Sequence, residues 1–211
     1  MKHDSVIFDI DGTLTNSIRP IMVSWNRFLS SSGYPHCLLT KETTASLMGK
    51  TMDEWAMAVL PELPLSLARE LTEIMEQEEN REIYTNGTDL YPYVRETFEE
   101  LSKTYDLFIL SNCGKGYIEA VMAAAGIEPF VKGHLCNGDT GLDKPENLRK
   151  MISDYDLKNP VYVGDTDRDR ECCETAGVPF IFVSYGFGSV PDAEYRADSL
   201  KDLPEIIPQV K

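Results

Sequence analysis

Short apolar runs alternate with helical segments along the second half of the chain, and this alternation is what most constrains the fold. The strand-like runs lie at residues 107–110, 130–136, 161–163 and 180–183, and helical patterns accompany them at 95–103, 117–125, 146–155 and 169–176. Strands that follow one another through helices run parallel and are covered by helices on both faces. The pattern therefore predicts an α/β fold built on a parallel sheet.

The first strand of this sheet is expected at residues 5–10, far from the other strands in sequence. Between them, residues 17–84 carry helical patterns and little strand signal. An insertion directly after the first strand lies at the carboxyl edge of the sheet, where such folds bind ligands. We therefore predict a core and an inserted helical domain, at residues 1–15 with 88–211 and at 16–87, respectively.

The insertion contains apolar side chains at the three- and four-residue spacing of helices. We interpret the aromatic residues Trp25, Phe28 and Trp55 as packing inside the insertion, and Leu67 and Ile74 as part of the apolar pattern of a longer helix. From Pro191 onward, the chain is expected to form a loop and one short helix that ends near Ile207.

Charge is unevenly distributed along the chain. The sequence has 20 basic and 35 acidic residues, a formal net charge of −15. Such a field repels nucleic acid and anionic membrane surfaces, so neither is expected as a partner. Residues 69–100 alone hold ten acidic and three basic side chains. We interpret this acidic stretch as a solvated helix surface.

The cysteine pattern bears on the compartment. Five cysteines form no Cys-x-x-Cys pair, which fits neither a disulfide framework nor a zinc site. No apolar run approaches the roughly 18 residues that a membrane span needs, and no signal peptide is recognised. We therefore expect a cytoplasmic protein.

Asp9 and Asp11 stand at the end of the first expected strand and precede Gly12-Thr13. Because residues i and i+2 of a strand point to the same side, both carboxylates can face one site. Two carboxylates beside an apolar strand are costly unless a positive group lies between them. The pair indicates a functional site, although either aspartate alone could be a turn or helix-capping residue.

Further polar clusters follow three of the later strands. Ser111 and Asn112 precede free amides at a helix start, a common anion site, although Ser111 alone is better explained as a helix N-cap. Lys144 stands just before a helix, where the helix dipole disfavours a lysine unless it has a charge partner. Residues 164–169 hold three aspartates but lack the glycine and glutamate positions of a calcium-binding loop.

Taken in order, these residues resemble the four motifs of the haloacid dehalogenase superfamily. The motifs are Asp9-Ile-Asp11-Gly-Thr13, Ser111-Asn112, Lys144-Pro145 and Gly164-Asp165-x-x-x-Asp169. They span nearly the whole chain, and Ser-Tyr-Gly-Phe-Gly at 184–188 is similar to the phosphoglycolate-phosphatase-like branch. The resemblance implies a Rossmann-like parallel core with an inserted α-helical cap domain.

The same resemblance implies a phosphatase mechanism. Asp9 would be the nucleophile that forms an aspartyl-phosphate, and Asp11 would act first as acid and then as base. Lys144 would bridge Asp9 and the phosphoryl group. The implied cofactor is Mg²⁺, bound by Asp9, the Asp11 carbonyl and Asp165, with Asp169 binding directly or through water.

The substrate side is less constrained. Ser111 and the Asn112 amide would hold phosphoryl oxygens, and the implied partner is a small phosphorylated metabolite. Lys50, in a loop where the family places its specificity residues, could reach a carboxylate or a second phosphate. Lys115 could assist the phosphate, and an ordinary surface lysine remains the alternative for both. We expect a monomer or a homodimer.

Asp11 separates reaction classes within this resemblance. The dehalogenases lack a second carboxylate there because a halide needs no proton, so Asp11 favours phosphate monoesters. A sugar-phosphate mutase shares every core residue and is the main alternative. A catalytically silent binding module, with the acidic face recruiting a basic partner, is a more distant one.

Overall fold

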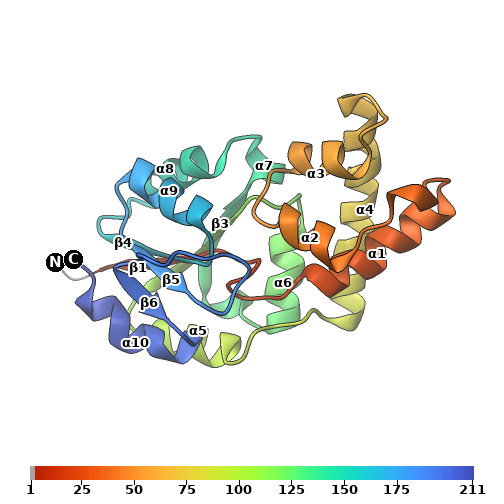
Figure 1. Ribbon diagram of the computed structural model, residues 1–211. Coiled ribbons are helices and arrows are strands. Elements are labelled where there is room, and N and C mark those ends of the chain that lie inside the picture. Colours follow the sequence, from red (N-terminus) through yellow and green to blue (C-terminus); the bar gives the residue numbers. More distant parts are fainter. Residues whose placement is uncertain (1–2) are drawn as a thin grey trace.

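A computed structural model describes residues 3–211 and shows one six-stranded parallel sheet (Figure 1). The strands are β1 (Ser5–Phe8), β2 (Asp106–Ser111), β3 (Val131–Cys136), β4 (Pro160–Gly164), β5 (Phe180–Val183) and β6 (Tyr195–Ala197). Their order is β3-β2-β1-β4-β5-β6, which confirms the predicted parallel α/β fold. The prediction of loop and helix after Pro191 was wrong in one respect, because β6 adds an edge strand there.

Helices cover both faces of the sheet (Figure 1). One face packs against α5 (Val94–Leu101), α6 (Tyr117–Ala125) and α10 (Leu203–Ile206), and the other against α8 (Lys144–Asp154) and α9 (Asp167–Ala176). One helical turn, α7 (Asn137–Thr140), follows β3, and 3-10 turns lie at Pro35–Cys37, Glu128–Phe130, Leu200–Asp202 and Ile207–Gln209. Since β1 is buried on both faces, its side chains alternate between two separate apolar cores.

Four helices lie together beyond the sheet, on the side away from the chain termini (Figure 1). They are α1 (Ile18–Ser31), α2 (Lys41–Leu47), α3 (Met52–Val59) and α4 (Leu65–Asn86). They share an apolar core of their own, in which the rings of Trp25 and Trp55 meet edge to face with centroids 5.1 Å apart.

The chain enters and leaves this four-helix group through two adjacent segments. Thr15 and Leu90 form an antiparallel bridge, and Tyr91 donates its backbone N–H to the carbonyl of Leu14 at 2.9 Å. These two paired segments, at residues 14–15 and 90–91, form a stem that connects the four helices to the core just past β1. The exact division into two folding units stays a prediction.

The longest of these helices, α4, is oriented differently from the sequence prediction. Leu67 and Ile74 are 40% and 43% exposed, whereas Met75, Glu76 and Glu79 are buried. The inward face of α4 therefore mixes apolar and acidic side chains, which the apolar spacing alone does not reveal.

No helix within residues 3–211 combines the length and the apolar character needed to cross a lipid bilayer.

An aromatic contact with α5 packs against the end of β1. Phe8, the residue before Asp9, packs on Phe98 of α5 with ring centroids 4.6 Å apart, and both rings are fully buried. We expect Phe98→Ala to lower the free energy of unfolding by about 3–5 kcal/mol, because it leaves a cavity under the strand. Urea unfolding followed by circular dichroism measures this change.

Two comparison variants test that explanation. Phe98→Leu should cost less than about 1.5 kcal/mol, and Tyr84→Ala, at a side chain that is 58% exposed, should change stability by less than about 0.5 kcal/mol. A similar loss in Phe98→Ala and Tyr84→Ala would contradict the role given to this contact.

Candidate active site

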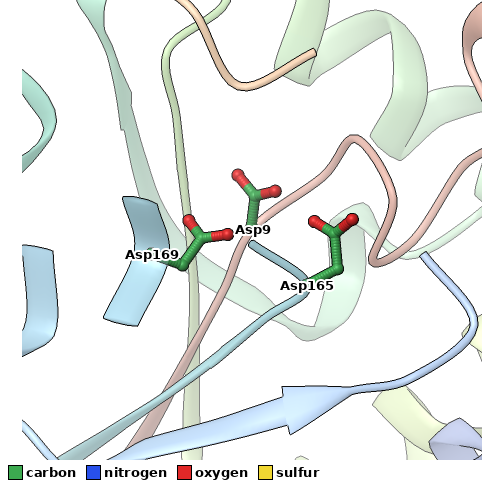
Figure 2. Close-up of side chains that lie close together, drawn as sticks. All are labelled: Asp9, Asp165 and Asp169. Carbon is green, nitrogen blue, oxygen red and sulfur yellow. The ribbon is translucent and has the colours of Figure 1, made fainter. Parts of the chain in front are cut away.

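Three aspartates converge at the carboxyl ends of the two central strands (Figure 2). Asp9 follows β1, Asp165 follows β4, and Asp169 lies in the first turn of α9. One carboxylate oxygen from each lies within 4.8 Å of the others, and all three residues are buried. Like charges at this distance in a buried site repel strongly, so the cluster requires positive charge.

Lys144 supplies part of that charge. Its Nζ donates to Asp9 Oδ1 at 2.6 Å and to Asp169 Oδ1 at 2.5 Å, and the residue is 6% exposed. Burial alone would lower the pKa of Lys144, but the charges of Asp169 and Asp9 outweigh it and raise that pKa. The ammonium therefore stays charged and fixes the orientation of the Asp9 carboxylate.

Asp165 and Asp169, the two aspartates that follow β4, have different surroundings. Asp169 uses its second oxygen to accept from Thr166 N at 3.0 Å and Thr166 Oγ1 at 2.6 Å, as part of the cap of α9. Asp165 Oδ2 accepts from the backbone N–H of Phe187 at 2.6 Å, but its buried Oδ1 has no hydrogen-bond partner among residues 3–211. Asp165 therefore has an oxygen available for a ligand, whereas both oxygens of Asp169 are engaged.

This donor set fits a hard divalent cation. Burial, aided by the nearby charge of Asp169, raises the pKa of Asp165 to about 7, so its ionised form is costly without a cation. Oxygen ligands from carboxylates are those that Mg²⁺ takes in proteins. Asp9 and Asp165 are the side chains suited to bind it, and Asp169 acts on the site by holding Lys144.

A loop after β5 closes tightly over Asp165. An added Cβ at Gly186 would lie 2.3 Å from the Asp165 side chain, and one at Gly12, where φ is +89°, would lie 2.1 Å from Asp165 Oδ2. Only glycine permits such approaches without displacing the carboxylate. The hydrogen bonds from this loop to Asp165 are not evident from the spacing of the motifs.

Asp11 lies apart from the three aspartates. It is half-buried, its Oδ1 accepts from the Tyr117 hydroxyl at 2.7 Å, and burial raises its pKa. A raised pKa favours the protonated acid, which is the form that can donate a proton to a leaving group. Tyr117, in the first turn of α6, is a site residue that the sequence analysis did not identify.

The site opens into a cavity of about 50 Å³ between the four-helix group and the core. Asp9, Asp11, Lys144, Ser111, Asn112 and Lys50 all line it. Lys115 is exposed and is not among the lining residues.

The N-cap interpretation of Ser111 was wrong. Ser111 is the buried last residue of β2, whereas α6 begins at Tyr117 with Gly116 as its N-cap. Its hydroxyl is therefore not committed to capping α6.

The acidic stretch on α4 needs a second correction. Glu76 and Glu79 are 9% and 5% exposed and line the cavity, so they are not part of a solvated surface. The wall beside them includes Trp25 and Trp55, which were expected only to pack within the insertion. The Glu79 carboxylate accepts from Trp25 Nε1 at 2.8 Å, a contact across 54 residues of sequence.

An ion pair ties the helical group to the core beside the aspartates. Arg168, at the start of α9, donates to both carboxylate oxygens of Glu54 on α3, each at 3.0 Å. Hydrogen bonding from Arg168 lowers the pKa of Glu54 to about 2. The loop that carries Lys50 is also held, because Asn112 Nδ2 donates to the Gly49 carbonyl at 3.1 Å.

Comparison with known sequences agrees with this geometry. The sequence model of the haloacid dehalogenase-like hydrolase family matches residues 6–183. A phosphoglycolate phosphatase of Vibrio parahaemolyticus is 24% identical to this chain, with 96% of this chain and 95% of the relative aligned. A plasmid-encoded phosphoglycolate phosphatase of Cupriavidus necator is 27% identical, over 97% of this chain and 91% of its own length.

Solved structures show the same fold. A crystal structure described as a predicted phosphoglycolate phosphatase from Haemophilus somnus superimposes with a TM-score of 0.82 at 21% identity, covering 97% of this chain and 98% of its own. A haloacid dehalogenase-like family hydrolase from Streptococcus pneumoniae gives a TM-score of 0.80 at 20% identity, covering 96% and 97%. The motifs, the fold and the family match together place this chain in the haloacid dehalogenase-like hydrolase family, in its phosphoglycolate-phosphatase-like branch.

Proposed function

We propose that this hydrolase of phosphoric monoesters is a Mg²⁺-dependent phosphatase of small phosphorylated metabolites that works through an aspartyl-phosphate. One observation carries the proposal: the Asp9 carboxylate is held by Lys144 at the wall of a cavity that also contains Asp11. A nucleophile, a cation beside it and a separate acid are what transfer of a phosphoryl group requires.

The reaction has two steps on this chain. A carboxylate oxygen of Asp9 attacks phosphorus, the bond from phosphorus to the ester oxygen breaks, and protonated Asp11 gives its proton to the leaving alcohol. Water then attacks the aspartyl-phosphate, Asp11 takes the proton from that water, and Asp9 is released together with inorganic phosphate. Lys144 and Ser111 would hold phosphoryl oxygens throughout.

Mg²⁺, bound by Asp9 and Asp165, would neutralise charge on the phosphoryl oxygens and on the clustered carboxylates. The available oxygen of Asp165 supports this assignment. The small cavity favours a short organic group on the substrate.

The nucleophile is tested by Asp9→Asn. We expect kcat for phosphate release from an aryl phosphate to fall by roughly a thousandfold or more, because an amide oxygen is a poor nucleophile. Asp154→Asn, at an exposed position on α8, is the control and should keep full activity. Turnover that persists in the Asp9 variant would refute the covalent mechanism.

Asp11→Asn tests the acid. Because kcat/KM reports the first irreversible step, we expect it to fall roughly 10²- to 10⁴-fold for an alkyl phosphate and far less for nitrophenyl phosphate, whose leaving group needs no proton. For the wild-type enzyme, kcat/KM for alkyl esters should decline as pH rises through the raised pKa of Asp11, because the protonated acid is lost. The Asp11→Asn variant should lack this decline. Equal losses for both esters would contradict the proton-donor role.

The cation site is tested without reference to activity. Mg²⁺ should raise the melting temperature of the wild-type protein, because it binds the folded state and relieves carboxylate repulsion. Asp165→Asn should abolish the shift, whereas Asp167→Asn, at an exposed neighbour paired with Arg170, should retain it. An equal Mg²⁺ shift in wild type and Asp165→Asn would exclude Asp165 as a ligand.

Product analysis separates the phosphatase from the sugar-phosphate mutase. Incubation with a hexose 1-phosphate should release inorganic phosphate, detected by a molybdate assay. Formation of the hexose 6-phosphate without phosphate release would favour the mutase.

A further inference from the structure

Two glutamates of α4 lie in the cavity where the organic part of a substrate would be placed. Glu76 and Glu79 are three positions apart in sequence, which puts them on the same face of the helix. Both are more than nine-tenths buried, and both line the cavity that contains Asp9 and Asp11. A solvated helix surface does not account for them.

The protein leaves these carboxylates only partly compensated. Glu79 accepts one hydrogen bond, from the neutral indole of Trp25 at 2.8 Å. Glu76 accepts from Arg69 at 3.3 Å, but Arg69 is shared with Asp53 at 3.2 Å and Glu73 at 3.5 Å. Within residues 3–211, the second oxygen of each of the two buried glutamates receives no hydrogen bond.

Burial raises the pKa of Glu76 to about 7 and that of Glu79 to about 8. The charged forms are therefore costly in the protein alone, and a cation placed between them would offset that cost.

Two residues that line the same cavity have amide oxygens without a hydrogen-bond partner among residues 3–211. Asn80 Nδ2 donates to the Lys115 carbonyl at 2.9 Å, and Asn112 Nδ2 donates to the Gly49 carbonyl at 3.1 Å. These carbonyls fix which end of each amide is the donor, so the acceptor oxygens of both are left free. Both oxygens are buried without a partner among the described residues. Unpaired buried acceptors favour a ligand that carries hydrogen-bond donors.

The remaining wall is suited to a positive group. Trp25 and Trp55 line the cavity, and the faces of indole rings attract ammonium groups. The volume of about 50 Å³ compares with roughly 10–15 Å³ for one water, which suits a small ligand.

We propose that the substrate is a phosphate monoester of a short amino alcohol, with its ammonium group bound by Glu76 and Glu79 and its phosphoryl group facing Asp9. The inference rests on the proposed phosphatase function and specifies its substrate class. It assigns to Glu76 and Glu79 the role of substrate-specificity residues.

Lys50 represents the competing possibility, since it also lines the cavity and is half-buried. A lysine suits a carboxylate-bearing ester such as phosphoglycolate, on which the named relatives act. In this chain, Glu76 and Glu79 line the same cavity, so that carboxylate would meet like charge whenever they are ionised.

Three esters with the same two-carbon skeleton distinguish these possibilities: 2-aminoethyl phosphate, 2-hydroxyethyl phosphate and phosphoglycolate. With Mg²⁺ present, kcat/KM for the amine should exceed that for the alcohol by roughly tenfold or more, as expected of hydrogen bonds to charged groups. Phosphoglycolate should be the poorest of the three.

Variants then assign the preference to the glutamates. Glu79→Gln and Glu76→Gln should remove most of the advantage of the amine while leaving kcat/KM for the neutral alcohol within about threefold, since they remove charge but little volume. Replacing a buried carboxylate by an amide also removes a desolvation cost, so both variants should fold. Glu70→Gln, at an exposed position on the same helix, is the matched control and should keep the wild-type preference.

The outcomes separate this inference from the function on which it rests. Equal kcat/KM for all three esters, or a preference for phosphoglycolate that Lys50→Met abolishes, would overturn the inference and leave the phosphatase intact. If no ester is hydrolysed, including an aryl phosphate, the proposed function fails. In that case, the ammonium site is tested by calorimetric titration of the Asp9→Asn variant. Tighter binding of 2-aminoethyl phosphate than of 2-hydroxyethyl phosphate supports the site, and equal binding refutes it.

Discussion

The contact of Lys144 with Asp9 and Asp169 is the interaction on which the site depends. It joins the end of β1 to the starts of α8 and α9, three segments that are far apart in sequence. A buried carboxylate pair without this ammonium would be strongly destabilising, and removing one member of a buried ion pair typically costs several kcal/mol. Because Asp169 also caps α9 through Thr166, the same contact fixes the helix that carries Arg168. The catalytic geometry and the packing of α8 and α9 are therefore coupled.

The helical group is positioned by contacts that converge on the same region. Arg168 binds Glu54 on α3, and Asn112 holds the Gly49 carbonyl, so the loop with Lys50 is attached to the core from two sides. The paired segments at Thr15 and Leu90 connect the two parts directly past β1. The ion pair is partly exposed, and such pairs contribute little individually. The helix α4 adds a firmer attachment, because Ile83 packs in the core of the sheet and Asn80 donates to the Lys115 carbonyl.

Local sequence patterns and parallel topology predict most of the sheet and the position of its site. Strand positions follow from short apolar runs, and parallel topology then brings Asp9, Ser111 and Asp165 to one edge of the sheet. The burial of Glu79 could not be predicted in this way, because acidic residues on a long helix are usually exposed, and its partner Trp25 lies on another helix. The exposed Leu67 and Ile74 misdirected the orientation of α4 for the same reason, since helical spacing identifies a face but not what that face meets. The motif at 184–188 marks the loop after β5, but its hydrogen bonds to Asp165 were not predicted, because sequence spacing does not show which residues this loop contacts.

The acidic character of the chain has two distinct consequences inside the cavity. Around Asp9, three carboxylates and the Lys144 ammonium leave a formal charge of −2, which a divalent cation would neutralise. Near α4, the partners of Glu76 and Glu79 within residues 3–211 are only a shared arginine and an indole. A dianionic phosphoryl group would bind favourably beside a cation at the aspartates, but it would not compensate Glu76 and Glu79. A substrate that carries both a phosphoryl group and an ammonium group complements both ends, and its own charge separation would orient it toward Asp9.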